Sequence, residues 1–548
     1  MDNLRFVLFA LLFFLGFMLW QQWQVDYGPK PEIAAVQPGE IQPEAKPDVP
    51  VSARGADDIA KRAETPAVAA APHRRISVVT DVVRMEIDTQ GGDIRKLELL
   101  SYPVSKDHPE QPVQLFTDEG LMFVAQSGFL GDEATAPTHH SDWQADASEY
   151  KLADGQDTLR IPLAWTNGEG VKVVKTYVLK RGSYDIVLEQ QVDNAAEAGW
   201  KGRQYVQLQR MDPGNKDQLV RTYTGGVLYT PEDKYKKISF KDMADENLDK
   251  KSKDGWIAMI QHYFVAAWIP TVGEEHSFYT KALSDNHFVI GAYSPAMEVK
   301  PGETKVFKTE LYAGPKLLRV LEKTAPGLDL TVDYGSLTII AEPVFWLLEQ
   351  FHKIFNNWGW AIIFVTITLK ALFFRLSAAS YRSMANMRKL QPKLAELKEK
   401  YGSDKHKLNT AMMEMYRKEK VNPLGGCLPI LVQIPVFISL YWVLVETVEM
   451  RQAPFLLWLN DLSDKDPYFV LPLIMGVSMF VQQKLSPPPS DPMQAKVMQF
   501  FPVMFTGFFA FFPSGLVLYW VVNNLLSILQ QWYINKVIIG DKPAPAST

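Results

Sequence analysis

The segment VTITLKALFFRL, residues 365–376, carries one lysine, Lys370, inside an otherwise apolar run. Upstream, WGWAIIF (residues 358–364) extends the run towards the roughly 20 apolar residues with which a helix crosses a bilayer. A lysine at such a depth costs about 3 kcal/mol or more. Either it faces a watery cavity between helices, or its stem reaches the headgroups near Arg375. The segment predicts a membrane-spanning helix whose ammonium group needs a polar environment.

Five further segments are long and apolar, so the sequence predicts an α-helical polytopic membrane protein. Residues 6–25 carry no charge and end near Trp20 and Trp23, which suit the membrane–water boundary. The bulky WQQWQ that follows offers no small-residue cleavage site, which favours an uncleaved anchor over a signal peptide. Pro472 interrupts the fourth of the six expected transmembrane helices. Besides the anchor at residues 6–25, the expected transmembrane helices lie at residues 358–374, 424–445, 467–483, 497–512 and 516–537.

The basic residues predict the orientation of these helices. Residues 376–420 hold eleven Lys or Arg against five Asp or Glu, a local charge of +6. By contrast, residues 446–468 hold only Arg451 and Lys465. Because basic loops stay in the cytoplasm, the first loop is expected inside and the second outside. Both termini then lie in the cytoplasm, with a large outer domain between the first two spans. A five-span alternative would place the C-terminus outside.

The outer domain is expected to be all-β. Residues 26–74 are rich in Pro, Ala and Glu and predict a disordered tether. From residue 75 to about 327 the apolar period changes to two, as in VRMEID and DIVLEQQV, with turn signals such as Gly91-Gly92. Many short strands indicate a β-sandwich. A carbohydrate-binding role and a partner-docking role both remain open. The single cysteine, Cys427, excludes a disulfide framework.

Two amphipathic regions flank the helix at residues 358–376. Residues 328–357 form a linker and an interfacial helix, with Val344, Leu348, Phe351 and Phe355 on one face. Residues 377–421 predict a helical hairpin that turns near Gly402, the second helix beginning after Ser403 or Asp404. Its methionines either accept apolar client sequences or pack the two helices together. Its charge suits anionic lipid or ribosomal RNA, without a specific nucleic acid sequence.

A second layer of polar side chains lies within the predicted spans. Thr366 and Lys370 are four residues apart on one helical face. The last span has a similar stripe, and Gln433 and the pair Gln499 and Thr506 add polar groups to two more helices. These residues either surround a water-filled cavity or hold the helices together by hydrogen bonds. The stripe of the last span is Tyr519, Asn523, Ser527 and Gln530.

Several long motifs resemble the Gram-negative type of the YidC/Oxa/Alb family of membrane protein insertases. They are EKVNPLGGCLPILVQIPVFISLYW, RQAPFLLWLNDLSDKDPYFVLPLIMG, FFPSGLVLYWVVNNL and LDLTVDYG. The resemblance implies a protein of the bacterial inner membrane, with a five-helix core, that inserts nascent membrane proteins alone or with the Sec translocon. It further implies a hydrophilic groove open to cytoplasm and lipid, a periplasmic supersandwich, no cofactor and no enzymatic activity. The ribosome, the signal recognition particle receptor and the lipid bilayer are further expected partners.

The same resemblance assigns roles to individual residues. Lys370 stands where the family usually has arginine, Thr366 matches the groove threonine, and Tyr519-Trp520 matches a pair of aromatics. The tail GDKPAPAST has a single lysine, which does not support ribosome binding through the tail. The expected groove residues are Thr366, Lys370, Gln433, Gln499, Thr506, Tyr519, Trp520, Asn523 and Ser527. The expected hairpin residues are Met384, Met387, Arg388, Lys389, Met412, Met413 and Met415.

Two other functions remain as alternatives, a solute transporter and a membrane-tethered periplasmic carbohydrate-binding protein. The first predicts internal repeats, and the second has no need of five further spans. No GxxxxGK[ST] motif is present, so no nucleotide site is expected. The expected order is anchor 1–25, tether 26–74, β-sandwich 75–327, linker and interfacial helix 328–357, second transmembrane helix 358–376, cytoplasmic hairpin 377–421, transmembrane helices three to six 422–537, and cytoplasmic tail 538–548.

Overall fold

The computed structural model describes residues 74–132, 135–214, 222–402, 404–419, 428–485, 492–534 and 536. These residues belong to two compact units, the first ending at Asp333 and the second beginning at Tyr334. The boundary therefore lies six residues beyond the predicted end of the β-domain. The predicted anchor at residues 1–25, the tether up to residue 73 and the tail from residue 538 fall outside the described residues.

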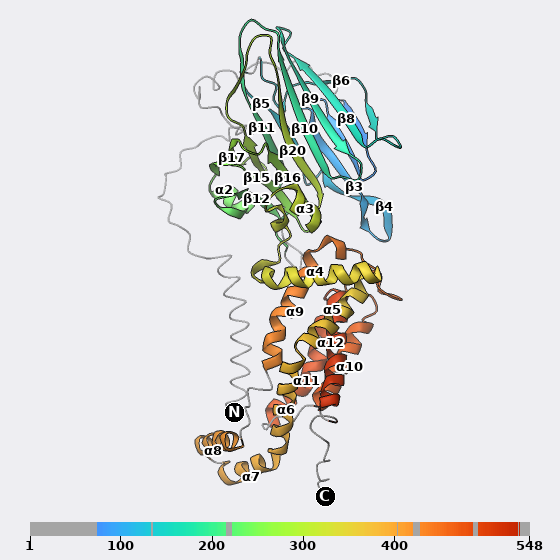
Figure 1. Ribbon diagram of the computed structural model, residues 1–548, viewed down its shortest axis with the longest axis vertical. Helices are drawn as coiled ribbons and strands as arrows, with labels where there is room; N and C mark the ends of the chain where they lie inside the picture. Colours follow the sequence, from blue (N-terminus) through green and yellow to red (C-terminus); the bar gives the residue numbers. More distant parts are fainter. Residues whose placement is uncertain are drawn as a thin grey trace. The chain divides into compact units, whose positions relative to one another are not determined.

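The described residues of the first unit form two large β-sheets that face each other, as expected of a supersandwich (Figure 1). The eleven-stranded sheet runs β14 (Asp249–Lys253), β17 (Glu275–Ala282), β18 (His287–Tyr293), β11 (Trp200–Met211), β5 (Phe123–Gly131), β3 (Asp93–Ser105), β2 (Val83–Asp88), β1 (Arg75–Val79) and β7 (Glu149–Lys151), with β19 (Met297–Val299) on β11 and β4 (His108–Phe116) on β3. The nine-stranded sheet runs β13 (Lys234–Ile238), β12 (Gly225–Thr230), β15 (Trp256–Gln261), β16 (Phe264–Pro270), β20 (Thr304–Pro315), β10 (Asp185–Asn194), β9 (Val171–Lys180), β8 (Thr158–Thr166) and β6 (Gln144–Ala145).

The predicted period of two is confirmed in these strands. In β10 every second residue from Ile186 to Asn194 is buried, and in β2 Val83, Met85 and Ile87 point into the core. Because one face of each sheet is apolar, the two faces bury against each other. Two short helices, α2 (Phe240–Asp245) and α3 (Leu318–Thr324), and a 3-10 turn, η2 (Leu328–Thr331), interrupt the otherwise all-β unit.

A buried ion pair joins the two sheets. The ammonium of Lys175 on β9 donates to the carbonyls of Gly91 and Ser127, at 2.7 and 3.0 Å, and lies 3.9 Å from Asp93 on β3. Gly91 and Gly92 form the predicted turn, and both have positive φ. Burial lowers the pKa of Lys175 to about 8, against an opposing effect of Asp93, and raises the pKa of Asp93. The apolar period of β9 gave no sign of this pair.

The second unit begins with the 3-10 turn η3 (Gly335–Leu337) and the amphipathic helix α4 (Thr338–Phe355), which lies within the predicted range of residues 328–357. Its buried residues are Ala341, Val344, Phe345 and Leu348. Phe355, expected on the same face, is partly exposed and stacks on Phe364, with ring centroids 4.4 Å apart. Helix α4 lies across one end of the bundle formed by the helices that follow (Figure 1).

The second apolar segment is bent rather than straight. Helix α5 (Trp358–Leu372) ends beside Lys370, and α6 (Phe374–Lys389) leaves it at 66°. The first half of α6 therefore belongs to the bundle, although residues from Ser377 onward were expected in the hairpin. Among the described residues this bent pair alone meets length and composition criteria for a membrane span, and no single helix does.

The remaining helices of the bundle match the predicted apolar segments. They are α9 (Leu428–Glu446), the 3-10 turn η5 (Val448–Met450), α10 (Val470–Leu485), α11 (Pro492–Phe509) and α12 (Ser514–Tyr533). Pro472 does not break α10, because it occupies the first turn, where no intrahelical donor is needed. Asp466 precedes α10 and accepts bonds from the Tyr468 and Leu471 amides and the Trp458 indole, at 3.0, 2.7 and 3.0 Å.

The hairpin lies at the end of the bundle opposite α4 and consists of α7 (Gln391–Tyr401) and α8 (Lys405–Lys418) (Figure 1). The prediction of one helix over residues 377–401 is wrong, because α6 ends at Lys389 and α7 starts at Gln391. Pro392 lacks the amide hydrogen that would continue α6. Asp404 caps α8 as predicted and accepts from the Lys407 amide at 3.2 Å. Lys393 and Glu419 form an ion pair between the ends of the hairpin, at 2.6 Å.

Candidate functional site

A cavity of about 390 Å³ lies within the bundle and is lined by α5, α6, α9, α10, α11 and α12. Half of its lining is polar: Lys370, Ser377, Ser380, Tyr381, Gln433, Gln482, Gln483, Asn523, Asn524, Ser527 and Gln531. The rest is apolar: Met384, Ile434, Phe437, Met479, Met498, Phe501, Pro502, Phe505 and Trp520. A cavity with both kinds of lining suits a ligand that has polar as well as apolar groups.

Lys370 projects into this cavity from the last turn of α5. Its ammonium donates to Ser527 Oγ at 2.7 Å, and Ser527 Oγ donates to the Asn523 carbonyl at 2.7 Å. Asn523 and Ser527 are four residues apart on α12, so both present the same face to α5. Within the described residues this bond occupies one of the three ammonium protons, which leaves the others for a ligand. The side chain therefore extends across the bundle to α12.

A smaller cavity of about 30 Å³ adjoins the first. Thr366 and Tyr519 line the small cavity, and Lys370, Gln433 and Asn523 line both. Thr366 is buried and donates to the Ile362 carbonyl at 2.7 Å, whereas the Gln433 amide approaches the Tyr519 hydroxyl at 3.5 Å. The predicted polar stripes of α5, α9 and α12 thus meet at one place, and they separate the two cavities.

Several lining residues were missed by the sequence predictions. Asn524 donates to Ser478 Oγ at 3.0 Å, and Gln531 donates to the Leu485 carbonyl at 3.1 Å, so both join α12 to α10. The spacing of Asn524, Ser527 and Gln531 is a second helical stripe that could have been found. Ser380 and Tyr381 were missed for another reason, since they were expected in the hairpin and the bend before α6 returns them to the bundle.

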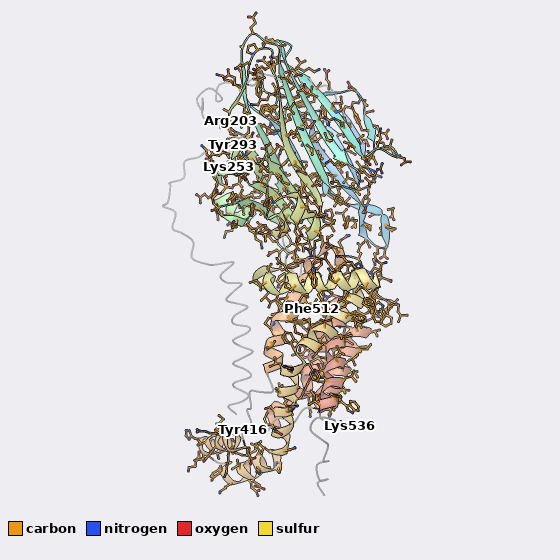
Figure 2. All side chains as sticks on the ribbon, in the orientation of Figure 1. Arg203, Lys253, Tyr293, Tyr416, Phe512 and Lys536 are labelled. Carbon is orange, nitrogen blue, oxygen red and sulfur yellow. The ribbon has the colours of Figure 1, made fainter. Side chains whose placement is uncertain are left out.

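An aromatic cluster lies where α9, α11 and α12 meet. Phe437 contacts the Trp520 ring at a centroid distance of 4.7 Å, and Phe509 contacts it at 5.3 Å. Tyr441 and Phe512, one turn further towards α4, are 5.9 Å apart. Phe512 marks this end of the bundle, and Lys536 marks the opposite end (Figure 2). The cluster joins α9 to α11 on the α4 side of the cavity.

Two residues expected in the groove lie elsewhere. Gln499 on α11 is exposed and lines neither cavity. Thr506 donates to the Pro502 carbonyl at 2.7 Å and faces Gly476 of α10, where a Cβ atom would strike its hydroxyl. Their spacing of seven places both on one face of α11, but Thr506 meets α10 and Gln499 is exposed, so neither lines the cavity. Gln530, although buried, lines neither cavity.

The expected hairpin residues are divided between two regions. Met384 lines the cavity from α6, and Met387 and Lys389 follow it towards α7. The Arg388 side chain lies outside the described part of the chain. On α8, Met413 is 62% exposed, whereas Met412 and Met415 are half-buried. Tyr416 marks α8 in Figure 2. An exposed methionine is available for an apolar partner, and half-buried ones also hold the hairpin together.

The described residues contain no group of three His, Cys, Asp or Glu side chains that could hold a metal ion. The cavity itself is lined by one charged residue, Lys370, and by no carboxylate. What the arrangement can do is therefore limited to binding through hydrogen bonds, one positive charge and apolar contacts.

Two family models match the chain. The one described as the YidC periplasmic domain covers residues 75–347, and the one described as 60Kd inner membrane protein covers residues 350–542. A relative from Methylococcus capsulatus named membrane protein insertase YidC is 65% identical over 98% of this chain and 99% of its own length. A relative of the same name from Thioalkalivibrio sulfidiphilus is 49% identical over 98% of this chain and 99% of its own length.

A solved structure described as an active YidC insertase with the first transmembrane domain resolved is also similar. It is 18% identical, covers 85% of this chain and 93% of its own, and has a TM-score of 0.38.

Proposed function

This chain belongs to the YidC family of membrane protein insertases, and on that premise we propose that the cavity around Lys370 is the groove through which it works. The protein is an inner-membrane insertase with a periplasmic domain, acts on nascent membrane proteins in the lipid bilayer, and is not an enzyme. The match over the full chain favours neither a solute transporter nor a tethered carbohydrate-binding protein.

One observation carries the groove proposal. Five helices, α5, α6, α9, α10 and α12, bring a lysine, amides and hydroxyls into one cavity that also has apolar lining residues. Polar groups inside a membrane are costly unless they bind one another or face water. The polar residues that flank a client's membrane span need such a partner while they cross, because in hydrocarbon they would lose their hydrogen bonds to water. The cavity supplies replacements for that water.

We further propose the arrangement of the chain in the membrane. Six transmembrane helices place both termini and the hairpin in the cytoplasm, and α4 lies along the periplasmic surface. The basic charge of residues 376–420 supports this orientation, as do the positions of α4 and the hairpin at opposite ends of the bundle (Figure 1). The aromatic cluster of Phe437, Phe509 and Trp520 closes the groove on the α4 side.

Insertion then proceeds in three steps. The hairpin receives an apolar client segment, for which the exposed Met413 is suited. Polar flanking residues enter the groove, where Lys370, Gln433 and Asn523 bind them. The apolar segment passes along α9 and α11 into lipid, driven by burial of about 20 apolar residues. No nucleotide is needed. The lipid-facing side chains of this path are exposed: Ile434, Ile438, Phe500, Val503 and Phe508.

We propose further partners besides the client. The insertase acts alone or with the Sec translocon, and the hairpin is the surface that would meet the ribosome or the signal recognition particle receptor. Its basic charge and exposed position support that role. The periplasmic sandwich is proposed as a docking module, so deleting most of residues 75–327 should leave insertion largely intact.

Site-specific cross-linking tests the groove directly. Photoreactive residues at Gln433 and Asn523, which line the cavity, should label the polar flank of a stalled single-span client. Leu525 on the same helix is 48% exposed on the lipid side and is the matched control for labelling of the apolar span. If the flank labels Leu525 and never the cavity positions, the groove proposal is wrong.

A further inference from the structure

The cavity is lined by more amide side chains than a site for a single charged tail requires. Of its twenty lining residues one is charged, while six are amides: Gln433, Gln482, Gln483, Asn523, Asn524 and Gln531. An amide side chain offers the same donor and acceptor groups as a peptide bond. The wall is thus chemically matched to polypeptide backbone, whatever side chains the backbone carries.

Three buried atoms of this lining have no hydrogen-bond partner within the described ranges. Two are acceptors, Oε1 of Gln483 on α10 and Oε1 of Gln531 on α12, and one is a donor, Nε1 of Trp520. The orientation of the Gln531 amide is fixed, because its nitrogen donates to the Leu485 carbonyl. Each unsatisfied buried polar atom costs about 1–3 kcal/mol. Acceptors and a donor without partners in residues that line one cavity point to a ligand that supplies both N–H and C=O groups.

The spacing of these atoms sets the length of the ligand. Trp520 and Gln531 are eleven positions apart on α12, which corresponds to about 16 Å at a rise of 1.5 Å per residue. An extended polypeptide advances about 3.3 Å per residue, so about five extended residues cover that distance. A helical segment would offer few free groups along such a length, since its own hydrogen bonds occupy them.

We propose that the cavity binds about five residues of extended client backbone, with Gln483 and Gln531 accepting from its N–H groups and Trp520 donating to one of its carbonyls. The substrate class is then the extended flank of a membrane span, neutral as well as charged. This rests on the proposed groove and deepens it. The physical reason is that unpaired backbone groups are costly to carry into hydrocarbon, and every flank has them irrespective of its sequence.

Backbone methylation of a client separates this inference from recognition of side chains. Full-length protein in liposomes is given a synthetic single-span client with a five-residue Ser/Ala flank, in normal form and N-methylated at alternate flank residues. N-methylation removes N–H groups and leaves the side chains and carbonyls. Binding to the native protein, measured by cross-linking from Asn523, should fall about tenfold, equivalent to about 1.4 kcal/mol.

A double variant supplies the decisive comparison. With Q483M and Q531M together, the normal client should bind as weakly as the methylated client binds to the native protein, and methylation should have no further effect. Gln350→Met on α4, outside the cavity lining, is the matched control and should behave as native. The inference would be overturned if both clients bound equally to the native protein. It would also be overturned if the loss of binding caused by the double variant and the loss caused by methylation added in full.

Trp520→Phe is the second variant, and it keeps the ring against Phe437 and Phe509 while removing the donor. The proposed partner of the Trp520 indole is a client carbonyl, which methylation leaves in place. Trp520→Phe should therefore weaken client binding a few-fold, and this effect should add to the effect of methylation. It also tests the inference should the double variant fail to fold. If neither client is labelled from Asn523, the groove proposal itself fails; if both are labelled equally, only the backbone inference fails.

Discussion

Replacing Lys370 tests the electrostatic part of the groove. Its ammonium is held at 2.7 Å from Ser527 and has protons left for a client carboxylate. Opposite charges about 4 Å apart attract by about 4 kcal/mol at an effective dielectric of 20. Desolvation of the carboxylate cancels part of this, so Lys370→Met should weaken binding of an acidic flank by about 2 kcal/mol, roughly 30-fold. A neutral flank should lose little.

The assay compares two clients that differ only in the flank, one with two Asp and one with two Ser, at equilibrium in liposomes. Lys370→Arg keeps the charge and should bind the acidic flank within a few-fold of native. Lys370→Glu should bind it more weakly than Lys370→Met, since repulsion replaces a lost attraction. Equal effects on the acidic and neutral flanks, or equal binding by the Arg and Glu variants, would show that Lys370 does not contact the client.

Three further predictions concern stability. Asp466→Ala removes the acceptor of three hydrogen bonds and should lower the local stability of residues 451–469 by about 2–3 kcal/mol. The loss should appear as faster proteolysis within that segment. Unchanged proteolysis would show that Asp466 does not hold the segment in place. Gly476→Ala should destabilise the bundle by about 1–3 kcal/mol, because the added Cβ strikes Thr506. Adding Thr506→Ala should restore most of the lost stability, as measured by thermal unfolding. A double variant no more stable than the single one would exclude that contact. Burial lowers the pKa of Lys175 to about 8, so between pH 8 and 10.5 the unfolded chain binds more protons than the folded chain. The denaturation midpoint of the periplasmic domain should therefore rise with pH over that window. Lys175→Met should abolish the rise.

The sequence was informative where one periodicity governs one element. The alternation of β10 and the apolar segments of the bundle predicted the strands and helices, because burial of a face dictates both patterns. The stripe of Asn523 and Ser527 likewise predicted which side chains share a face with Lys370.

Periodicity did not reveal which neighbour each face meets. Gln499 and Thr506 share a face of α11, yet Thr506 faces Gly476 of α10. The 66° bend after Leu372 returned Ser380 and Tyr381 to the bundle, and no proline or glycine marks that bend. The Lys175–Asp93 pair depends on residues from two sheets, 82 positions apart, which only the folded topology brings together.

Entry of water into the bundle from the cytoplasm is the central claim, and cysteine accessibility measures it most directly. In a Cys427→Ser background, single cysteines at Asn523 and Gln433 should react with a membrane-impermeant thiol reagent added to the cytoplasmic face of inside-out vesicles. Cysteines at Val517, buried towards the other end of α12, and at Leu525, on its lipid face, should not react. If the cysteines at both cavity positions reacted as little as those at the two control positions, the account would be contradicted.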